Sequence, residues 1–361
     1  TNNTIVRARA FAPGLLPGPI DTRTYIALSA QTNIVNFKSD LPIMILHNFG
    51  RGAVPSGSDQ FVVVQTFEPR FGISCLTNTP ELAEQGIFHL RGSSTLTYAK
   101  GSFRLEVRDE YGLDKDVPLL GLPADSDWVL YAPNNFEPAL FHNPLAFQLA
   151  RDMGHYGSRT RFVEVYLKDD SNANLPVSAA DYNGIYVLEE KIKINSDRVD
   201  IDYPEPEDIN PPEVTGGYLL SIDRPNGEPQ LSAGGTTMNW IDPSGTETAI
   251  TARAAQRNYI TKYFNDFNSV LSTANWTNPV TGYAAYIEVD SWIDRHIHEV
   301  LTYNVDALRL SGYFYKPRNG KLHYGPPWDY DRTQGSTDGR DFNPRTFRST
   351  CGDLGTDFFN F

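Results

Sequence analysis

The order of secondary-structure patterns along the sequence is the strongest constraint on what this chain can fold into. Short strand patterns, in which apolar and polar residues alternate, dominate the first half. Two long helical patterns follow, at residues 254–271 and 289–301, before one late hairpin. Strands and helices do not alternate regularly, as they would in a parallel sheet. The sequence therefore predicts an α+β fold.

The first strand pair is the easiest to delimit. Residues 4–10 (TIVRARA) and 22–28 (TRTYIAL) flank a turn rich in Pro and Gly, which predicts a terminal β-hairpin. The first clear helix is predicted at residues 138–153, and the late hairpin pairs GYFYK with KLHYG. Further strands are predicted at residues 41–47, 60–66, 86–91, 102–108, 161–167, 184–190 and 217–223.

Composition narrows the class of protein. The 361 residues carry a formal net charge of -13 and no dense basic cluster, which argues against a nucleic-acid partner. No apolar run reaches the roughly 18 residues of a membrane span. Cys75 and Cys351 either pair or stay free, and the sequence leaves both open. We expect both ends to be cuts in a longer polypeptide, because the last residues, GDLGTDFFNF, are apolar enough to continue into a packed element.

Several common catalytic templates are missing from the sequence. It contains neither a P-loop motif nor a dinucleotide-binding glycine motif after a strand, and no nucleophile elbow. The stretch HIHE resembles a zinc-binding motif. However, His296 and His298 lie two positions apart on a predicted helix and point to different faces, so we expect exposed or capping histidines.

An ordered series of polar residues remains. Asn304 and Asp306 follow a predicted helix, the late hairpin comes next, and Asp329 and Asp331 follow its second strand. Phosphoryl transfer uses one carboxylate to orient the attacking hydroxyl and another to hold Mg²⁺ on the phosphates. The alternative is that these acids only stabilise turns and helix ends.

A second group of candidates lies upstream. Arg91, Ser93 and Lys100 surround a predicted strand–turn–strand, and a lysine there can contact nucleotide phosphates. Its expected partner is Glu190, which shares a strand face with Tyr186 and lies at the edge of an apolar surface. The alternative for Lys100 is a solvated lysine at the end of a strand.

Together these motifs resemble the spore-coat protein H (CotH) kinase family, atypical kinases that phosphorylate secreted or surface proteins. The likeness covers about Asp40 to the C-terminus. It depends on the order of RGSS, KGSF, DWVLYA, LFHNPLAFQLARDMG, FVEVYL, GIYVLEEKI, GGYLLSID, NVD and GPPWDYD, of which WDYD is the strongest element.

The resemblance implies roles for individual residues. Asp306 matches the catalytic aspartate, and Asp329 matches the aspartate that binds Mg²⁺, with Asp331 beside it. Nucleotide contacts are implied for Arg91, Ser93, Lys100 and Glu190. Asn143 matches a recurrent asparagine that we interpret as a structural hydrogen bonder.

The resemblance also implies a fold and a cofactor. The fold would be kinase-like, with a β-rich N-terminal lobe and a helical C-terminal lobe, incomplete at its C-terminal end. ATP and Mg²⁺ would be bound without a glycine-rich loop. Ser311 stands where the family commonly has an asparagine that helps to hold a second metal ion. The serine side chain is shorter than that of asparagine, but its hydroxyl can still bind Mg²⁺.

Residues 1–29 look like part of a chitobiase-type β module, which leaves residues 30–361 as the kinase-like domain. The leading hypothesis is an extracellular or envelope-associated protein kinase that phosphorylates Ser or Thr, with a basic or neutral Ser-rich segment as its preferred substrate. The alternative is a non-catalytic surface-assembly or adhesion module. A glycosidase fits poorly, because Asp329 and Asp331 on one loop do not supply carboxylates about 5–9 Å apart across a sugar.

Overall fold

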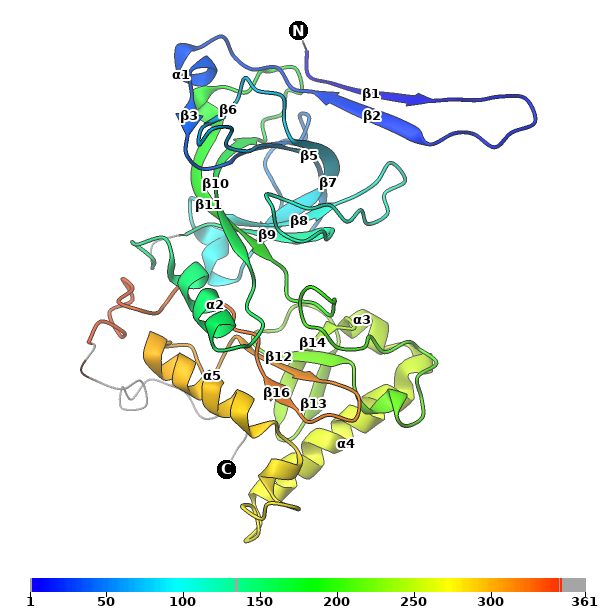
Figure 1. The fold of residues 1–361 in the computed structure, drawn as a ribbon, viewed down its shortest axis with the longest axis vertical. Coiled ribbons are helices and arrows are strands. Elements are labelled where there is room, and N and C mark those ends of the chain that lie inside the picture. Colours follow the sequence, from blue (N-terminus) through cyan, green and yellow to red (C-terminus); the bar gives the residue numbers. More distant parts are fainter. Residues whose placement is uncertain (1, 134–135, 344, 346–361) are drawn as a thin grey trace. The chain divides into compact units, whose positions relative to one another are not determined.

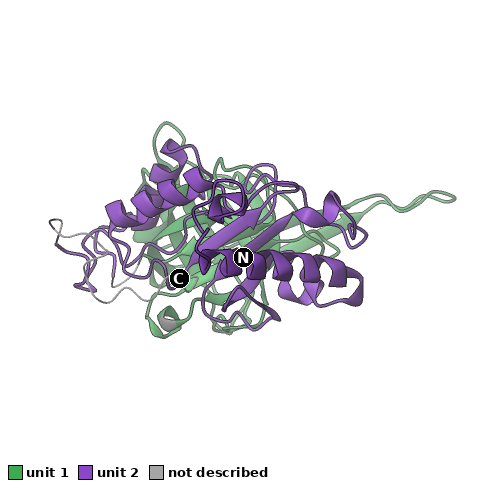
Figure 2. Ribbon diagram, turned by 90° about the horizontal axis from the view of Figure 1, so that it is seen from below, with its two compact units in different colours: residues 1–134, 160–191 green, residues 135–159, 192–361 purple. Residues whose placement is uncertain are grey.

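The computed structural model describes residues 2–133, 136–343 and 345, and the chain divides into two compact units (Figure 2). The first unit comprises residues 1–134 and 160–191, and the second comprises residues 135–159 and 192–361. Neither unit is continuous in sequence, because residues 135–159 of the second unit interrupt the first. Each unit is described here by itself.

A closed seven-stranded β-barrel forms the centre of the first unit (Figure 1). The strands follow the order β10-β11-β9-β8-β7-β5-β4, and β4 closes the barrel by pairing in parallel with β10. All other neighbours in the barrel are antiparallel. The strands of the unit are β1 Thr4–Arg9, β2 Ile20–Tyr25, β3 Lys38–Ser39, β4 Ile43–His47, β5 Gln60–Phe67, β6 Ser74–Cys75, β7 Leu82–Arg91, β8 Ser102–Val107, β9 Asp127–Tyr131, β10 Thr160–Lys168 and β11 Tyr182–Glu190. Its short helical turns are α1 Thr32–Val35, Ser94–Thr97 and Ala179–Asp181.

Strand alternation explains how the barrel is filled. In β8 the residues Phe103 and Leu105 are buried in the core, whereas the intervening Arg104 belongs to a polar network outside it. In β11 the residues Tyr186 and Leu188 contribute to the same core. The hairpin predicted at the N-terminus is confirmed as β1 and β2.

The second unit is built on a five-stranded antiparallel sheet with the order β13-β14-β12-β15-β16. Helix α4 packs against β13, and helix α5 packs against β16 and α2. The elements are α2 His142–Asp152, β12 Tyr218–Ile222, β13 Gln230–Ala233, β14 Thr236–Asp242, α3 Gly245–Thr248, α4 Ala254–Leu271, α5 Val289–Thr302, β15 Gly312–Lys316 and β16 His323–Tyr324, with 3₁₀ turns at Glu213–Thr215, Thr251–Arg253 and Tyr283–Ala285.

The expected kinase-like fold with a helical C-terminal lobe is wrong. The second unit has a β-sheet as its central layer, and the first is a closed barrel. The helical patterns themselves are confirmed, since α4 spans residues 254–271 as predicted, α5 ends one residue later than predicted, and α2 lies within four residues of its predicted bounds. The sequence analysis predicted neither strand β9 nor the hairpin of β13 and β14, although β13 alternates exposed and buried residues.

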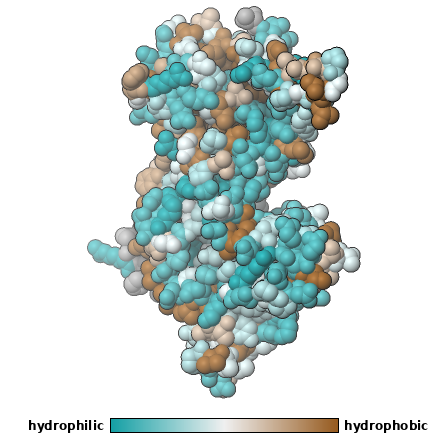
Figure 3. Space-filling view, turned by 45° about the vertical axis from the view of Figure 1, so that its right-hand side comes forward, coloured by the Kyte–Doolittle hydropathy of each residue, from teal (hydrophilic) through white to brown (hydrophobic). Residues whose placement is uncertain are grey.

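Surface and terminal features complete the description. Hydrophilic side chains predominate on the face shown in Figure 3. Within the part of the chain that the structure describes, no helix is both long and apolar enough to cross a membrane. Cys75 is half-buried and forms no disulfide with another described residue. Cys351 and the apolar C-terminal residues lie outside the described residues, so the predictions about them stay predictions.

Candidate functional site

The acidic series of the sequence lies around one edge of the sheet in the second unit. Helix α5 ends where Tyr303 adopts a left-handed backbone conformation, with φ 53°. The chain then runs through Asp306 to Ser311, forms the hairpin of β15 and β16, and continues into the loop that carries Asp329 and Asp331. Because the two strands are antiparallel partners, the segment before β15 and the segment after β16 leave the hairpin at the same end.

Asp306 is fixed in place by two local contacts. Its backbone N–H donates to Asn304 Oδ1 at 3.1 Å, and its carboxylate forms an ion pair with the Arg309 guanidinium. The side chain of Asp306 keeps 15% of its surface exposed. This carboxylate is therefore oriented and still accessible, as a base that takes a proton from a substrate must be.

Ser311 brings two further carboxylates together. Its hydroxyl lies 3.2 Å from Asp223 Oδ2 and 3.4 Å from Asp329 Oδ2. Both Ser311 and Asp329 have positive φ angles, 53° and 63°, which non-glycine residues rarely adopt and which cluster at functional sites. The predicted proximity of Ser311 and Asp329 is thus present in the structure.

The pKa of Asp331 is raised to about 8. Burial is the largest cause, and the negative charge of Asp329 is the next. The nearby Arg332 lowers the pKa, whereas Asp306 and Glu137 raise it further. Asp331 therefore lies among several negative charges, and a bound cation would reduce the repulsion between them.

The donor chemistry of this acidic group suits Mg²⁺. Carboxylates and a hydroxyl are hard oxygen ligands, and Mg²⁺ at nucleotide sites commonly takes one or two carboxylates and completes its shell with phosphate oxygens and water. Among the described residues, no three His, Cys, Asp or Glu side chains are arranged to hold a metal ion by themselves. Asp329, Asp331 and Ser311 are the predicted residues that would hold Mg²⁺.

Tyr330 anchors the loop that carries the two aspartates. Its ring is fully buried, and its hydroxyl lies 2.9 Å from His298 Nδ1. His298 Nε2 lies 2.8 Å from the carbonyl oxygen of Ala146, which can only accept, so Nε2 carries the proton and Nδ1 accepts from the Tyr330 hydroxyl. The backbone N–H of Tyr330 donates to Asn143 Oδ1 at 2.7 Å. Asn143 was predicted to be a structural hydrogen bonder at the start of its helix; it makes a structural hydrogen bond, but to the loop around Tyr330.

The prediction for the two histidines was partly wrong. His296 is exposed, but His298 is buried, with 2% of its surface accessible. Helical periodicity correctly placed the two residues on different faces of α5. It did not show that the His298 face would be covered by α2 and by the loop around Tyr330.

Burial of His298 predicts a loss of stability in mild acid. Burial, assisted by the charge of Arg295, lowers the pKa of His298 from 6.5 to about 3, so below pH 6.5 the unfolded chain gains a proton that the folded protein does not. The contribution of neutral His298 to the free energy of unfolding is fully present above pH 6.5. It falls by at most about 1.4 kcal/mol per pH unit as the pH is lowered toward 3. Urea unfolding at several pH values measures this, and His298→Gln should flatten the decline whereas His296→Gln should not. An equally steep decline in both variants would contradict the assignment.

Two of the upstream candidates lie at the end of β7. Arg91 is the last residue of that strand, paired with Ser102 of β8, and the exposed Ser93 precedes the 3₁₀ turn Ser94–Thr97.

Lys100 follows in the loop that leads into β8. The pKa of Lys100 is lowered by burial, which the charge of Glu164 opposes. Its ammonium group donates to the Ile185 carbonyl and lies 4.5 Å from the centre of the Tyr186 ring, so Lys100 is not the solvated lysine of the alternative reading.

Lys100 and Glu190 are not brought together. The ammonium group contacts Ile185, five positions before Glu190 on β11, which corresponds to about 16 Å of extended strand. Glu190 is fully buried at the far end of β11, where it pairs in register with Trp128. The expected location of Glu190 next to an apolar surface is confirmed, but the expected ion pair with Lys100 is not formed.

A cavity of about 360 Å³ lies beside Lys100 within the first unit. Its lining combines aromatic side chains such as Tyr98 and Phe103 with the carboxylates of Asp169 and Asp181. A pocket that contains both apolar and polar groups is typical of small-molecule sites.

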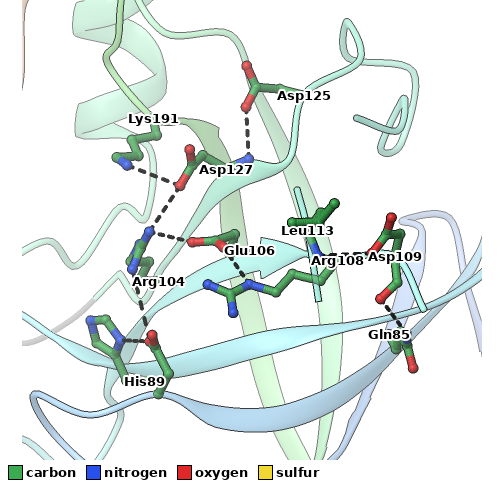
Figure 4. A network of polar contacts seen from close by, with 11 residues as sticks. Gln85, His89, Arg104, Glu106, Arg108, Asp109, Leu113, Asp125, Asp127 and Lys191 are labelled. Carbon is green, nitrogen blue, oxygen red and sulfur yellow. Dashed lines mark hydrogen bonds and ion pairs between the residues drawn. The ribbon is translucent and has the colours of Figure 1, made fainter. Parts of the chain in front are cut away.

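Figure 4 shows a network of charged side chains on the outer side of the barrel. We interpret its role as structural. Arg104 contacts both Glu106 and Asp127, Arg108 Nε donates to Glu106 at 2.6 Å, and Lys191 contacts Asp127 at 3.0 Å (Figure 4). Glu106 pairs with Arg104 and Arg108 of its own strand segment, and Asp127 pairs with Arg104 of β8 and with Lys191 after β11. The network therefore joins β8, β9 and the end of β11, and leaves little charge for a ligand.

Sequence reasoning missed two acids of the candidate site. Asp223 follows β12 directly, and Glu137 lies before α2, far from the acidic series in sequence. Only the pairing of β12 with β15 brings Asp223 to Ser311. A signal for Asp223 was present, since GGYLLSID was among the noted motifs, but no role followed from it.

Comparison with known proteins agrees with the resemblance seen in the motifs. The model of a protein family described as "CotH kinase protein" matches residues 88–355, a stretch that contains every candidate site residue named above. No curated protein matches the chain.

Proposed function

The chain belongs to the CotH kinase protein family, and on that premise we propose that it transfers the γ-phosphate of ATP to Ser or Thr hydroxyls of proteins. The observation that carries the proposal is the convergence of carboxylates around the β15–β16 hairpin. Asp306 precedes the hairpin, Asp329 and Asp331 follow it, and the charges of the other two raise the pKa of Asp331. Phosphoryl transfer needs a base and a metal-binding acid in this kind of proximity.

Each residue of this group has a distinct proposed role. Asp306 accepts the proton of the attacking hydroxyl, and its ion pair with Arg309 sets the direction of the carboxylate. Asp329, Asp331 and Ser311 hold Mg²⁺. Bound Mg²⁺ would neutralise negative charge on the phosphates.

In the first unit we propose Arg91, Ser93, Lys100 and Glu190 as nucleotide contacts. Burial lowers the pKa of Lys100, and an anionic phosphate nearby would favour its charged form again. The adjacent cavity of about 360 Å³ has aromatic side chains that suit a flat base, beside the polar side chains of Asp169, Asp181 and Asn183.

The setting of the reaction is also a proposal. We propose that the protein acts outside the cell or at the cell envelope, as in a spore coat, and belongs to a longer multidomain polypeptide. A basic or neutral Ser-rich segment would be the preferred substrate, because the net charge is -13.

A thermal-unfolding titration tests nucleotide binding directly. Mg²⁺ with ATP at about 100 times its Kd should stabilise the folded protein by about 2.7 kcal/mol, and a chelator should abolish most of that gain. The non-catalytic assembly module predicts no stabilisation that depends on Mg²⁺. Equal unfolding temperatures with Mg-ATP and with ATP plus chelator would therefore favour the module and reject the kinase.

The raised pKa of Asp331 predicts that Mg²⁺ affinity depends on pH. Below its pKa of about 8 this carboxyl carries a proton that Mg²⁺ must displace, so affinity should rise with pH and level off above about pH 8. The measurement is the Mg²⁺-dependent stabilisation at about pH 6, 7 and 8.5, in wild type and in Asp331→Asn. A pH dependence unchanged in Asp331→Asn would contradict the assignment. The matched control is Asp266→Asn on α4, whose side chain is 42% exposed and pairs with Lys262.

A further inference from the structure

We propose that Asp223 is a further ligand of the divalent cation held by Asp329, an assignment that rests on the proposed function. The two carboxylates would bind from opposite sides of the Ser311 hydroxyl. The ligand would be a hard cation such as Mg²⁺ or Mn²⁺, bound together with a nucleotide.

Strand register is what places Asp223 at the site. The antiparallel pairing of β12 with β15 sets Ile222 opposite Gly312. The next residue on β12, Asp223, and the residue before Gly312, Ser311, are therefore neighbours across the strand ends. This contact is fixed by the sheet and does not depend on the flexibility of a long side chain.

The Ser311 hydroxyl is shared between both acids. It has one proton, whereas Asp223 Oδ2 lies 3.2 Å away and Asp329 Oδ2 lies 3.4 Å away. Both distances are longer than the roughly 2.7–2.8 Å of a well-formed O–H···O hydrogen bond. Ser311 itself is buried, with 5% of its surface exposed, so water has limited access to this oxygen.

Local contacts fix the position of the Asp223 carboxylate. The backbone N–H of Arg224 donates to Asp223 Oδ1 at 2.7 Å, while Asp223 Oδ2 faces the Ser311 hydroxyl. Asp223 and Asp329 therefore approach the same hydroxyl group, and a cation bound between them would offset the repulsion of two neighbouring carboxylates.

The arrangement matches the way Mg²⁺ is bound at nucleotide sites. One carboxylate comes from the end of β12 and the other from the loop after β16, so two separate elements fix the spacing between them. Two carboxylates and a hydroxyl leave most of an octahedral shell for phosphate oxygens and water.

The test measures metal binding instead of catalysis. Mn²⁺ would be titrated into the full chain in the presence of a non-hydrolysable ATP analogue, with free Mn²⁺ followed by electron paramagnetic resonance. Asp223→Asn and Asp329→Asn should each weaken Mn²⁺ binding by about 10–100-fold, whereas the matched control Asp266→Asn should bind like wild type.

A second readout separates metal binding from folding. Asn at position 223 keeps one oxygen, which can accept from the Arg224 N–H as Asp223 Oδ1 does, and its NH₂ group can donate to the Ser311 hydroxyl in place of Oδ2. The substitution removes the negative charge. Without metal, Asp223→Asn should unfold at the same or a higher temperature than wild type, and its Mn²⁺-dependent stabilisation should be reduced. A variant that is destabilised without metal would show a structural role and overturn the inference.

The outcomes distinguish this inference from the proposed function. If Asp329→Asn weakens Mn²⁺ binding and Asp223→Asn does not, the role of Asp223 is rejected and the proposed function stands. If wild type with the nucleotide analogue binds no Mn²⁺ beyond that held by the free nucleotide, the proposed function fails and the inference fails with it.

Discussion

Replacing Asp306 with asparagine should lower the rate of phosphoryl transfer from ATP by about 10²–10⁴-fold, the usual contribution of a positioned general base. Asparagine cannot take a proton from the attacking hydroxyl, although it has nearly the same shape. The Arg309 guanidinium would still find an oxygen to contact. The measurement is incorporation of labelled phosphate into a Ser-rich acceptor or into the chain itself.

Binding should survive the same substitution, which separates a chemical role from loss of the site. Asp306→Asn should keep the stabilisation by Mg-ATP, whereas Asp329→Asn should lose most of it together with activity. Asp266→Asn should match wild type in both measurements. Equal phosphate incorporation by wild type, Asp306→Asn and Asp329→Asn would end the kinase proposal.

Replacing Tyr330 with alanine should destabilise the protein by about 3–5 kcal/mol, the usual cost of removing a large buried aromatic side chain. The ring of Tyr330 packs edge-on against Phe147, with ring centres 6.4 Å apart, and its hydroxyl satisfies the buried His298. Alanine would leave both a cavity and an unpaired imidazole nitrogen. Urea unfolding at neutral pH measures the loss.

The conservative variant Tyr330→Phe divides this effect into its parts. It keeps the ring and removes only the bond to His298 Nδ1, so we expect a loss of about 1–3 kcal/mol. Both variants should also weaken the Mg²⁺-dependent stabilisation, because Tyr330 fixes the backbone between Asp329 and Asp331. A loss below about 1 kcal/mol in Tyr330→Ala would show that this residue does not anchor the loop.

Local sequence patterns were sufficient for most individual elements. Strand alternation predicted β8 and β11 and the burial of Glu190 at the end of an apolar face. Helical periodicity predicted α4 and placed His296 and His298 on different faces of α5. These features depend on residues within a few positions of one another, so a single sequence contains the information.

The missed features that determine the architecture depend on long-range pairing. Closure of the barrel requires β4 to pair with β10, and the central sheet of the second unit requires β12 to pair with β15. No local pattern specifies either partner. The same pairings determine that Asp223 reaches Ser311 and that Lys100 contacts Ile185 far from Glu190.

The interruption of the barrel segment by α2 has a consequence for synthesis on the ribosome. The first unit has all its strands once Glu190 has emerged, whereas His298, which contacts α2 at the carbonyl of Ala146, is made 152 residues after that contact. The interval is longer for Asn143, because its partner Tyr330 is synthesised 187 residues later. Because domains generally fold as units, N-terminal ones first, α2 lacks these packing partners until translation reaches the end of the second unit.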